Sequence, residues 1–233
     1  NTRRGVLVRR GGPSQALPAT SLRMEGFTIR NGRATGQVNN VGGGLKANYS
    51  DVTLRDMVFD GSVAVGGSGG IGGGGGAAIQ ADDLNVMTVV LERVTFRNNQ
   101  ATGGGGTGGV GVGGGLLVDY AVVTGQQLAF ETNSAVGGGS STEGKDGLGG
   151  GLALFFGTES EIHGLTATGN SATGGSASSV GGSAFGGGVF VEGSDTAAEA
   201  TTAAGRYGFV LEAVVDAARP AAGLKARLAA LRE

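Results

Sequence analysis

The chain has 233 residues, of which 52 are glycine, and its 17 basic and 19 acidic residues give a formal net charge of −2. A hydrophobic fraction of 39% together with periodic glycines excludes a disordered linker, and the near-neutral charge argues against a nucleic-acid partner. The sequence has no cysteine, which excludes disulfides and thiolate metal sites, and no apolar run long enough for a membrane span.

The first residues already follow a strand pattern. Gly5-Val6-Leu7-Val8 is a glycine-led apolar segment, and Ser21–Ile29 supplies the next strand. We therefore expect the chain to begin within a coil, so that either further coils precede Asn1 or another subunit covers the amino-terminal edge. Residues 1–10 lack the apolar region of a signal peptide.

A glycine run precedes an apolar segment five times, at intervals of 32 to 39 residues. The runs end at Gly44, Gly76, Gly115, Gly151 and Gly188. A period of this length is typical of a solenoid or a repeat array. The first apolar residues after the runs are Leu45, Ala77, Leu116, Leu152 and Val189, and we expect their side chains to point inward.

A second strand accompanies each repeat, with the pattern apolar-x-apolar-x-x-Asn-x-Ala. Its copies begin at Phe27, Met57, Val94, Leu128 and Leu165. Apolar residues two positions apart lie on one face of a strand. The second inward column is Ile29, Phe59, Phe96, Phe130 and Ala167. An earlier column is Met24, Leu54, Leu91, Gly125 and Ile162, and it fits the same inward register except at Gly125.

Such a unit cannot bury its inner face alone, but stacked units form a continuous core. The sequence predicts a right-handed parallel β-helix of about six coils over residues 1–195, with glycine-rich lateral loops. Each coil adds about 4.8 Å along the axis. The handedness follows from the general preference for right-handed crossovers.

Asn99, Asn133 and Asn170 share one corner of the repeat. Stacked amides can hydrogen-bond to one another, and asparagine tolerates the left-handed backbone of a sharp corner. We predict a structural asparagine ladder; the alternative is three unrelated turn residues.

Glycine-rich insertions of growing length leave each coil at one edge. They cover residues 35–41, 65–73, 102–112, 136–148 and 173–185. They are either flexible loops or extended polyglycine layers that stack on one another, because glycine permits close backbone approach.

Residues 196–233 break the repeat. We expect residues 196–204 to be an Ala- and Thr-rich linker without a second strand. Residues 209–218 and 221–232 have apolar residues at helical spacing and are separated by Pro220. They predict a helical cap over the last coil; a dimerising helix is the alternative.

The repeats contain F-x-x-N motifs at Phe96–Asn99 and Phe130–Asn133, which alternate with Gly-Gly-apolar motifs such as Gly114-Gly115-Leu116. This alternation resembles the passenger region of the polymorphic outer-membrane protein family over about residues 21–191. Gly32 and Ser62 depart from the motif asparagine, and Ala167 departs from the phenylalanine. The resemblance implies a right-handed parallel β-helix that is secreted or surface-exposed and acts as an adhesin or surface-layer part.

Many parallel β-helices cleave polysaccharides with paired carboxylates. Here Asp119 and Glu192 would face outward two coils apart, about 10 Å along the axis, with Phe155 between them. We therefore predict no catalytic residues, and keep a polysaccharide lyase or hydrolase as the alternative function. His163 is expected at the surface. Asp82-Asp83 and Glu143–Asp146 read as solvated loop acids, so no metal or cofactor is predicted.

Leu117, Phe155 and Phe190 form an apolar outward column, which is typical of a contact surface. The alternative is that a glycine-rich loop folds over them.

We expect an extracellular or cell-surface structural or adhesive protein within a larger assembly, such as a fibre or surface layer. Its expected partners are copies of itself, neighbouring surface proteins, or a host receptor or glycan.

Overall fold

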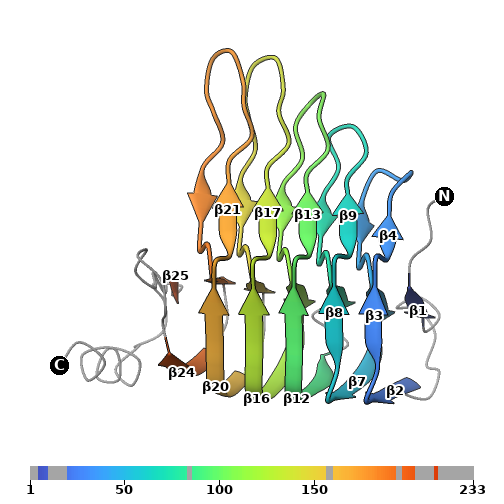
Figure 1. The fold of residues 1–233 in the computed structure, drawn as a ribbon. Coiled ribbons are helices and arrows are strands. Elements are labelled where there is room, and N and C mark those ends of the chain that lie inside the picture. The colour runs from blue at the N-terminus through green and yellow to red at the C-terminus, as the bar shows by residue number, and fades with distance from the viewer. Residues whose placement is uncertain are drawn as a thin grey trace.

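The computed structural model describes residues 5–9, 20–82, 86–155, 160–192, 196–202 and 213–214. This part of the chain is all-β and forms a parallel β-solenoid of four sheets, as Figure 1 shows. Two of the sheets have five strands each, which corresponds to about five full turns rather than the predicted six.

Sheets A and B enclose the core. Sheet A contains, in order, β1 (Val6–Arg9), β6 (Leu45–Asn48), β11 (Ala77–Gln80), β15 (Leu116–Asp119), β19 (Leu152–Phe155), β23 (Val189–Glu192) and β25 (Ala213–Val214). Sheet B contains β2 (Thr20–Glu25), β7 (Ser50–Arg55), β12 (Met87–Arg97), β16 (Ala121–Glu131), β20 (Ser160–Thr168) and β24 (Thr196–Thr202), with β3 (Thr28–Arg30) and β8 (Val58–Asp60) paired beside β12.

Sheets C and D are made of short strands beyond the core. Sheet C contains β4 (Arg33–Ala34), β9 (Val63–Val65), β13 (Gln100–Thr102), β17 (Ser134–Val136) and β21 (Ser171–Thr173). Sheet D contains β5 (Asn40–Val41), β10 (Gly72–Gly73), β14 (Gly111–Val112), β18 (Gly147–Leu148) and β22 (Ala184–Phe185).

The strand register confirms the inward columns predicted from the repeat. Ala77 pairs with Leu45 on one side and Leu116 on the other. All three are fully buried in a core that draws only on sheets A and B and the turns that adjoin them. Alternation along each strand therefore places one column of side chains inside and the next outside.

A phenylalanine stack runs through the centre of this core. The rings of Phe59 and Phe96 lie 4.8 Å apart and nearly parallel, and those of Phe96 and Phe130 lie 5.1 Å apart. The ring spacing is close to the strand spacing, because parallel in-register strands repeat the same position every coil.

Phe27 is an exception among the predicted inward residues. Its equivalent Met57 in the next coil is fully buried, whereas the Phe27 side chain is 59% exposed. Phe27 directly precedes β3, which pairs on one side only with β8. The prediction of an inward position was wrong there, because no described strand lies on the other side to enclose the ring.

The three glycines of each run have different roles. The first, such as Gly113, has a left-handed backbone, and its equivalents have φ between 55° and 69°. Glycine adopts this conformation without the penalty of a side chain. A Cβ on the third, Gly115, would lie 2.6 Å from the Gly151 carbonyl oxygen of the next coil. The run is therefore a tight reversal packed between neighbouring coils.

Asn99, Asn133 and Asn170 form one hydrogen-bonded column. The Nδ2 of Asn99 donates to Oδ1 of Asn133 at 3.0 Å, and Nδ2 of Asn133 donates to Oδ1 of Asn170 at 2.9 Å. The column continues into the preceding coil, where Asn99 Oδ1 accepts the backbone N–H of Ser62. Asn99 and Asn133 are buried, so these bonds satisfy groups that water does not reach.

The carboxy-terminal region differs from its prediction where it is described. Thr196–Thr202 is not a linker, because it forms β24 and pairs with β20. Ala213 and Val214 were predicted to be helical, but they form β25 beside β23. The rest of the predicted helical cap lies outside the described residues.

Candidate functional site

Five glycine-rich arms project from the solenoid and lie side by side (Figure 1). Each arm connects a strand of sheet C to a strand of sheet D. Arms one to five are residues 35–39, 66–71, 103–110, 137–146 and 174–183. Together with sheets C and D they form a projection that we call the fin. Its arms lengthen from five residues in arm one to ten in arms four and five.

The arms are joined by backbone hydrogen bonds. The N–H of Gly104 in arm three donates to the Gly70 carbonyl in arm two, and Gly109 donates across arm three to Gly104. The chain of bonds continues from Gly138 to Gly109 and from Lys145 to Gly138. Of the two arrangements left open by the sequence, the structure therefore has the stacked layers.

Glycine is required in the fin because the arms touch through their backbones. A Cβ on Gly104 would overlap the carbonyl oxygen of Gly67 in the neighbouring arm, and one on Gly138 would overlap that of Gly104. The adjacent Gly105 differs: the nearest atom to its Cβ would be the Gly139 carbonyl oxygen at 3.6 Å, and its side is exposed.

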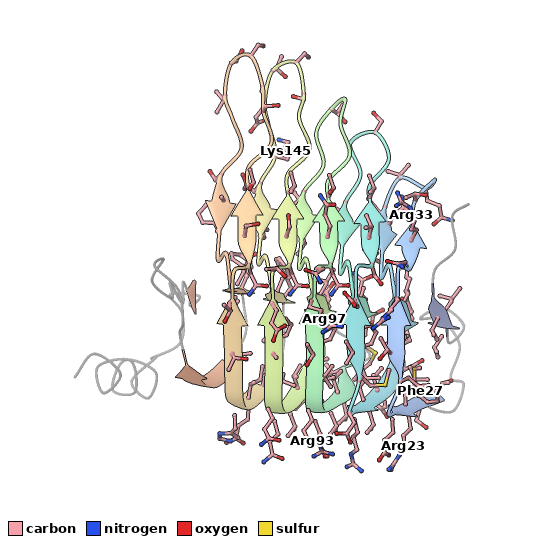
Figure 2. All side chains as sticks on the ribbon, in the orientation of Figure 1. Arg23, Phe27, Arg33, Arg93, Arg97 and Lys145 are labelled. Atoms are coloured by element: carbon pink, nitrogen blue, oxygen red, sulfur yellow. The ribbon has the colours of Figure 1, made fainter. Side chains whose placement is uncertain are left out.

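Hydroxyl groups gather at the arm tips. The exposed residues there include Ser68, Thr107, Ser141, Thr142 and Ser178. In arm four, Lys145 Nζ is 2.8 Å from Oε2 of Glu143, and Figure 2 shows Lys145 within the fin. Besides this pair, Asp146 is the sole charged residue of the five arms. The fin surface is therefore hydroxyl-rich and nearly neutral.

The predicted contact column of Leu117, Phe155 and Phe190 is largely covered. Leu117 is 4% exposed and Phe190 is 6% exposed, while Phe155 is half-buried. The return strands of the fin pack over this column, with Val112 against the Leu117 cluster and the Phe185 ring 6.5 Å from that of Phe190. The expectation of an exposed column was wrong, and the alternative of coverage by the glycine-rich segments describes the structure.

The carboxylates considered for catalysis remain dispersed. Asp119 and Glu192 occupy β15 and β23, with Phe155 of β19 between them in register. Strands at this separation place the two Cα atoms about 10 Å apart. His163 lies on sheet B, exposed, with its Nε2 2.8 Å from Oε1 of Glu161.

Asp119 is nevertheless unusual. Its Oδ1 is buried and has no hydrogen-bond partner among the described residues, and burial raises the pKa of this carboxyl to about 6. Its outward neighbours in register are the neutral Gln80 and Phe155.

Within the described ranges, no group of three His, Asp or Glu side chains is arranged to hold a metal ion. Asp82 lies in the described part and Asp83 outside it.

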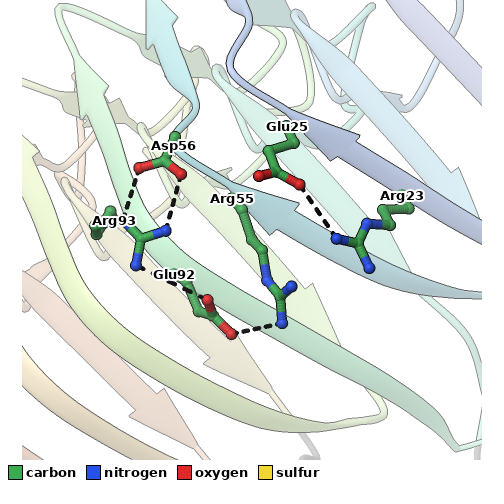
Figure 3. Close-up of polar contacts among 6 residues, drawn as sticks. All are labelled: Arg23, Glu25, Arg55, Asp56, Glu92 and Arg93. Atoms are coloured by element: carbon green, nitrogen blue, oxygen red, sulfur yellow. Dashed lines mark hydrogen bonds and ion pairs between the residues drawn. The ribbon is translucent and has the colours of Figure 1, made fainter.

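Sheet B carries a set of ion pairs that the sequence reading missed (Figure 3). Arg55 and Glu92 are 2.9 Å apart, and Asp56 contacts Arg93 through two hydrogen bonds of 2.6 and 2.8 Å. The Arg93 hydrogen bonds hold the pKa of Asp56 below its usual value. Each pair spans 37 residues, so the repeat period applied to charged positions would have found them.

The described residues contain no helix of the length and apolar character needed to cross a membrane. Comparison with protein-family models, with curated proteins and with solved structures found no match to this chain.

Proposed function

We propose that this protein is a secreted or cell-surface structural and adhesive protein, and that the fin is the surface it presents to its partners. The observation that carries the proposal is the ordered stack of arms, which stands outside the core and lengthens along the solenoid. The family resemblance of the repeats supports the same function class.

Ordering the fin costs conformational entropy, although the fin contributes no side chain to the main core. Ordering one residue costs about 1 to 2 kcal/mol of backbone entropy, and glycine loses more freedom than other residues. The main core contains no side chain from sheet C, sheet D or an arm. Shorter connections would close each coil, so the long ordered arms are best explained by contact with something outside the chain.

The surface chemistry favours a neutral polar partner. Hydroxyl side chains and backbone groups can hydrogen-bond to a glycan or to a protein surface, and the arms carry few charged residues. We therefore place glycans and neighbouring surface proteins ahead of charged polymers as partners.

The location is tested by treating intact source cells with protease and detecting the protein with an antibody. A surface protein is cleaved on intact cells, whereas an internal one is cleaved only after lysis. Protection of the chain on intact cells, together with its absence from the medium, contradicts the proposal.

The role of the fin is tested with beads coated with the purified chain, measured for adhesion to cells and to a glycan array. In a variant, arms three to five are each replaced by Asn-Gly, which leaves the core residues unchanged. Loss of adhesion with a retained β-sheet spectrum supports the fin as the contact surface. Equal adhesion of both proteins contradicts it.

A further inference from the structure

Among the described residues, arm five is the last layer of the fin, and no described strand covers its outer edge. Sheet C ends at β21 and sheet D ends at β22, whereas sheets A and B continue with β25 and β24. Only residues 203–212 separate β24 from β25, compared with residues 169–188 between β20 and β23. Among the described residues, none beyond β22 forms a further strand of sheet C or sheet D.

The backbone at this edge has hydrogen-bonding capacity left over. The carbonyls of Gly70, Gly109 and Lys145 each accept an N–H from the next arm. Gly182 occupies the same place in arm five, and no described N–H donates to its carbonyl. Strand edges present both N–H and C=O groups, so β21 and β22 offer donors as well.

The side chains of the edge do not protect it. Natural edge strands avoid pairing through charged residues, proline or bulges. From Gly164 to Val191 the sequence has no charged residue and no proline. Val180 is 61% exposed and Phe185 is 36% exposed, and both belong to this edge. At the opposite end of the fin, the exposed Arg33 provides a charge.

We propose that the arm-five edge, formed by residues 171–185, is a self-association surface that binds the same edge of a second copy of this chain. An interface between identical surfaces is self-complementary. An uncharged edge meets its own copy without repulsion, whereas the charged end at Arg33 does not. The inference rests on the proposed function, because it names one of the partners of the fin.

The shape of the molecule permits this pairing. The fin projects away from the solenoid body (Figure 1), so two fins can lie side by side with their bodies at opposite ends. Val180 and Phe185 then lie at the interface, and the Gly182 carbonyl meets the N–H groups of the second edge.

The test is the mass of the intact chain by sedimentation and light scattering from micromolar to several hundred micromolar. We expect a dimer of about twice the 22.7 kDa chain mass, and Val180→Lys should lower the association constant at least tenfold. Val38→Lys is the matched control, because Val38 is 64% exposed at the opposite end of the fin and should leave the dimer unchanged.

A second measurement is disulfide cross-linking of single-cysteine variants, which is specific because the chain has no cysteine of its own. Ser179→Cys at the edge should form an intermolecular disulfide under mild oxidation, whereas Thr107→Cys on arm three should form far less. A monomer at all concentrations, or equal loss of the dimer in the two lysine variants, overturns the proposal. Surface location and adhesion by the monomeric Val180→Lys chain would leave the proposed function standing.

Discussion

Gly104 packs directly against the carbonyl oxygen of Gly67 in the neighbouring arm, so closely that no side chain can be placed there. A Cβ on Gly105, the next residue, would make only an ordinary contact with the Gly139 carbonyl oxygen at 3.6 Å, and Gly105 is exposed. Substitutions at these two adjacent glycines can therefore show whether the order of the fin depends on close backbone contacts or only on a high glycine content.

Gly104→Ala should therefore destabilise the fin, by about 1 to 3 kcal/mol, the usual cost of forcing extra atoms into a packed region. Gly105→Ala is the control and should be neutral or slightly stabilising, because alanine restricts the unfolded chain. Hydrogen exchange of the arm-three amides and thermal unfolding measure both effects. Equal behaviour of the two variants would mean that the arms are not stacked as described.

The asparagine ladder should contribute strongly to stability at its centre. Asn133→Ala removes the acceptor of Asn99 and the donor to the Phe96 carbonyl, both in the buried interior. Leaving buried polar groups unsatisfied costs about 1 to 3 kcal/mol. Asn170→Ala, at the partly buried end of the column, should cost less. Denaturant unfolding compares the two, and a larger loss for Asn170→Ala would contradict the ladder as the cause.

The main core was predictable because most positions of its columns repeat an apolar residue at the same place relative to the glycine run of each coil. Phe59, Phe96 and Phe130 illustrate this, since the shared strand motif aligns them and the strand register pairs them. The coverage of Leu117 was harder to predict. Val112 precedes the glycine run and Leu117 follows it, and only the left-handed reversal at Gly113 brings the two together.

The stacking of the fin could not be deduced in the same way. Glycine has no side chain and therefore leaves no inward or outward pattern in the sequence. The decisive contacts, such as Gly109 with Gly104, are backbone bonds that many glycine-rich sequences could form or omit. The sequence consequently left flexible loops and stacked layers open. Phe27 shows another limit, because a repeat identifies a core position without showing whether a neighbouring coil covers it.

The ion pair of Asp56 and Arg93 should give a small, salt-sensitive coupling. Both side chains are exposed at 44% and 48%, and exposed pairs contribute little because water and salt screen them. A double-mutant cycle with Asp56→Asn and Arg93→Gln should show a favourable coupling in the melting temperature at low salt. The coupling should vanish in about 1 M NaCl, where the screening length is about 3 Å. A salt-independent coupling would point to packing instead.

The half-buried carboxyl of Asp119 should make the fold more stable in mild acid than near neutrality. Its folded-state pKa is raised from 3.8 to about 6 by burial, so the folded chain holds this proton more tightly than the unfolded chain. The destabilisation caused by the buried charge is therefore fully present above pH 6 and is relieved as the pH falls toward 3.8.

The full pKa shift corresponds to about 3 kcal/mol, and partial exposure of Asp119 reduces the expected effect to about 1 to 2 kcal/mol. Asp119→Asn should stabilise the protein by this amount at pH 7.5 and have little effect near pH 4. Asp56 and Asp60 act in the opposite sense, because their hydrogen bonds lower their pKa values, and their contribution is lost only below about pH 4. Thermal unfolding of both proteins from pH 4 to 8 measures the difference directly. Parallel curves across that range would show that Asp119 remains fully charged and solvated in the folded chain.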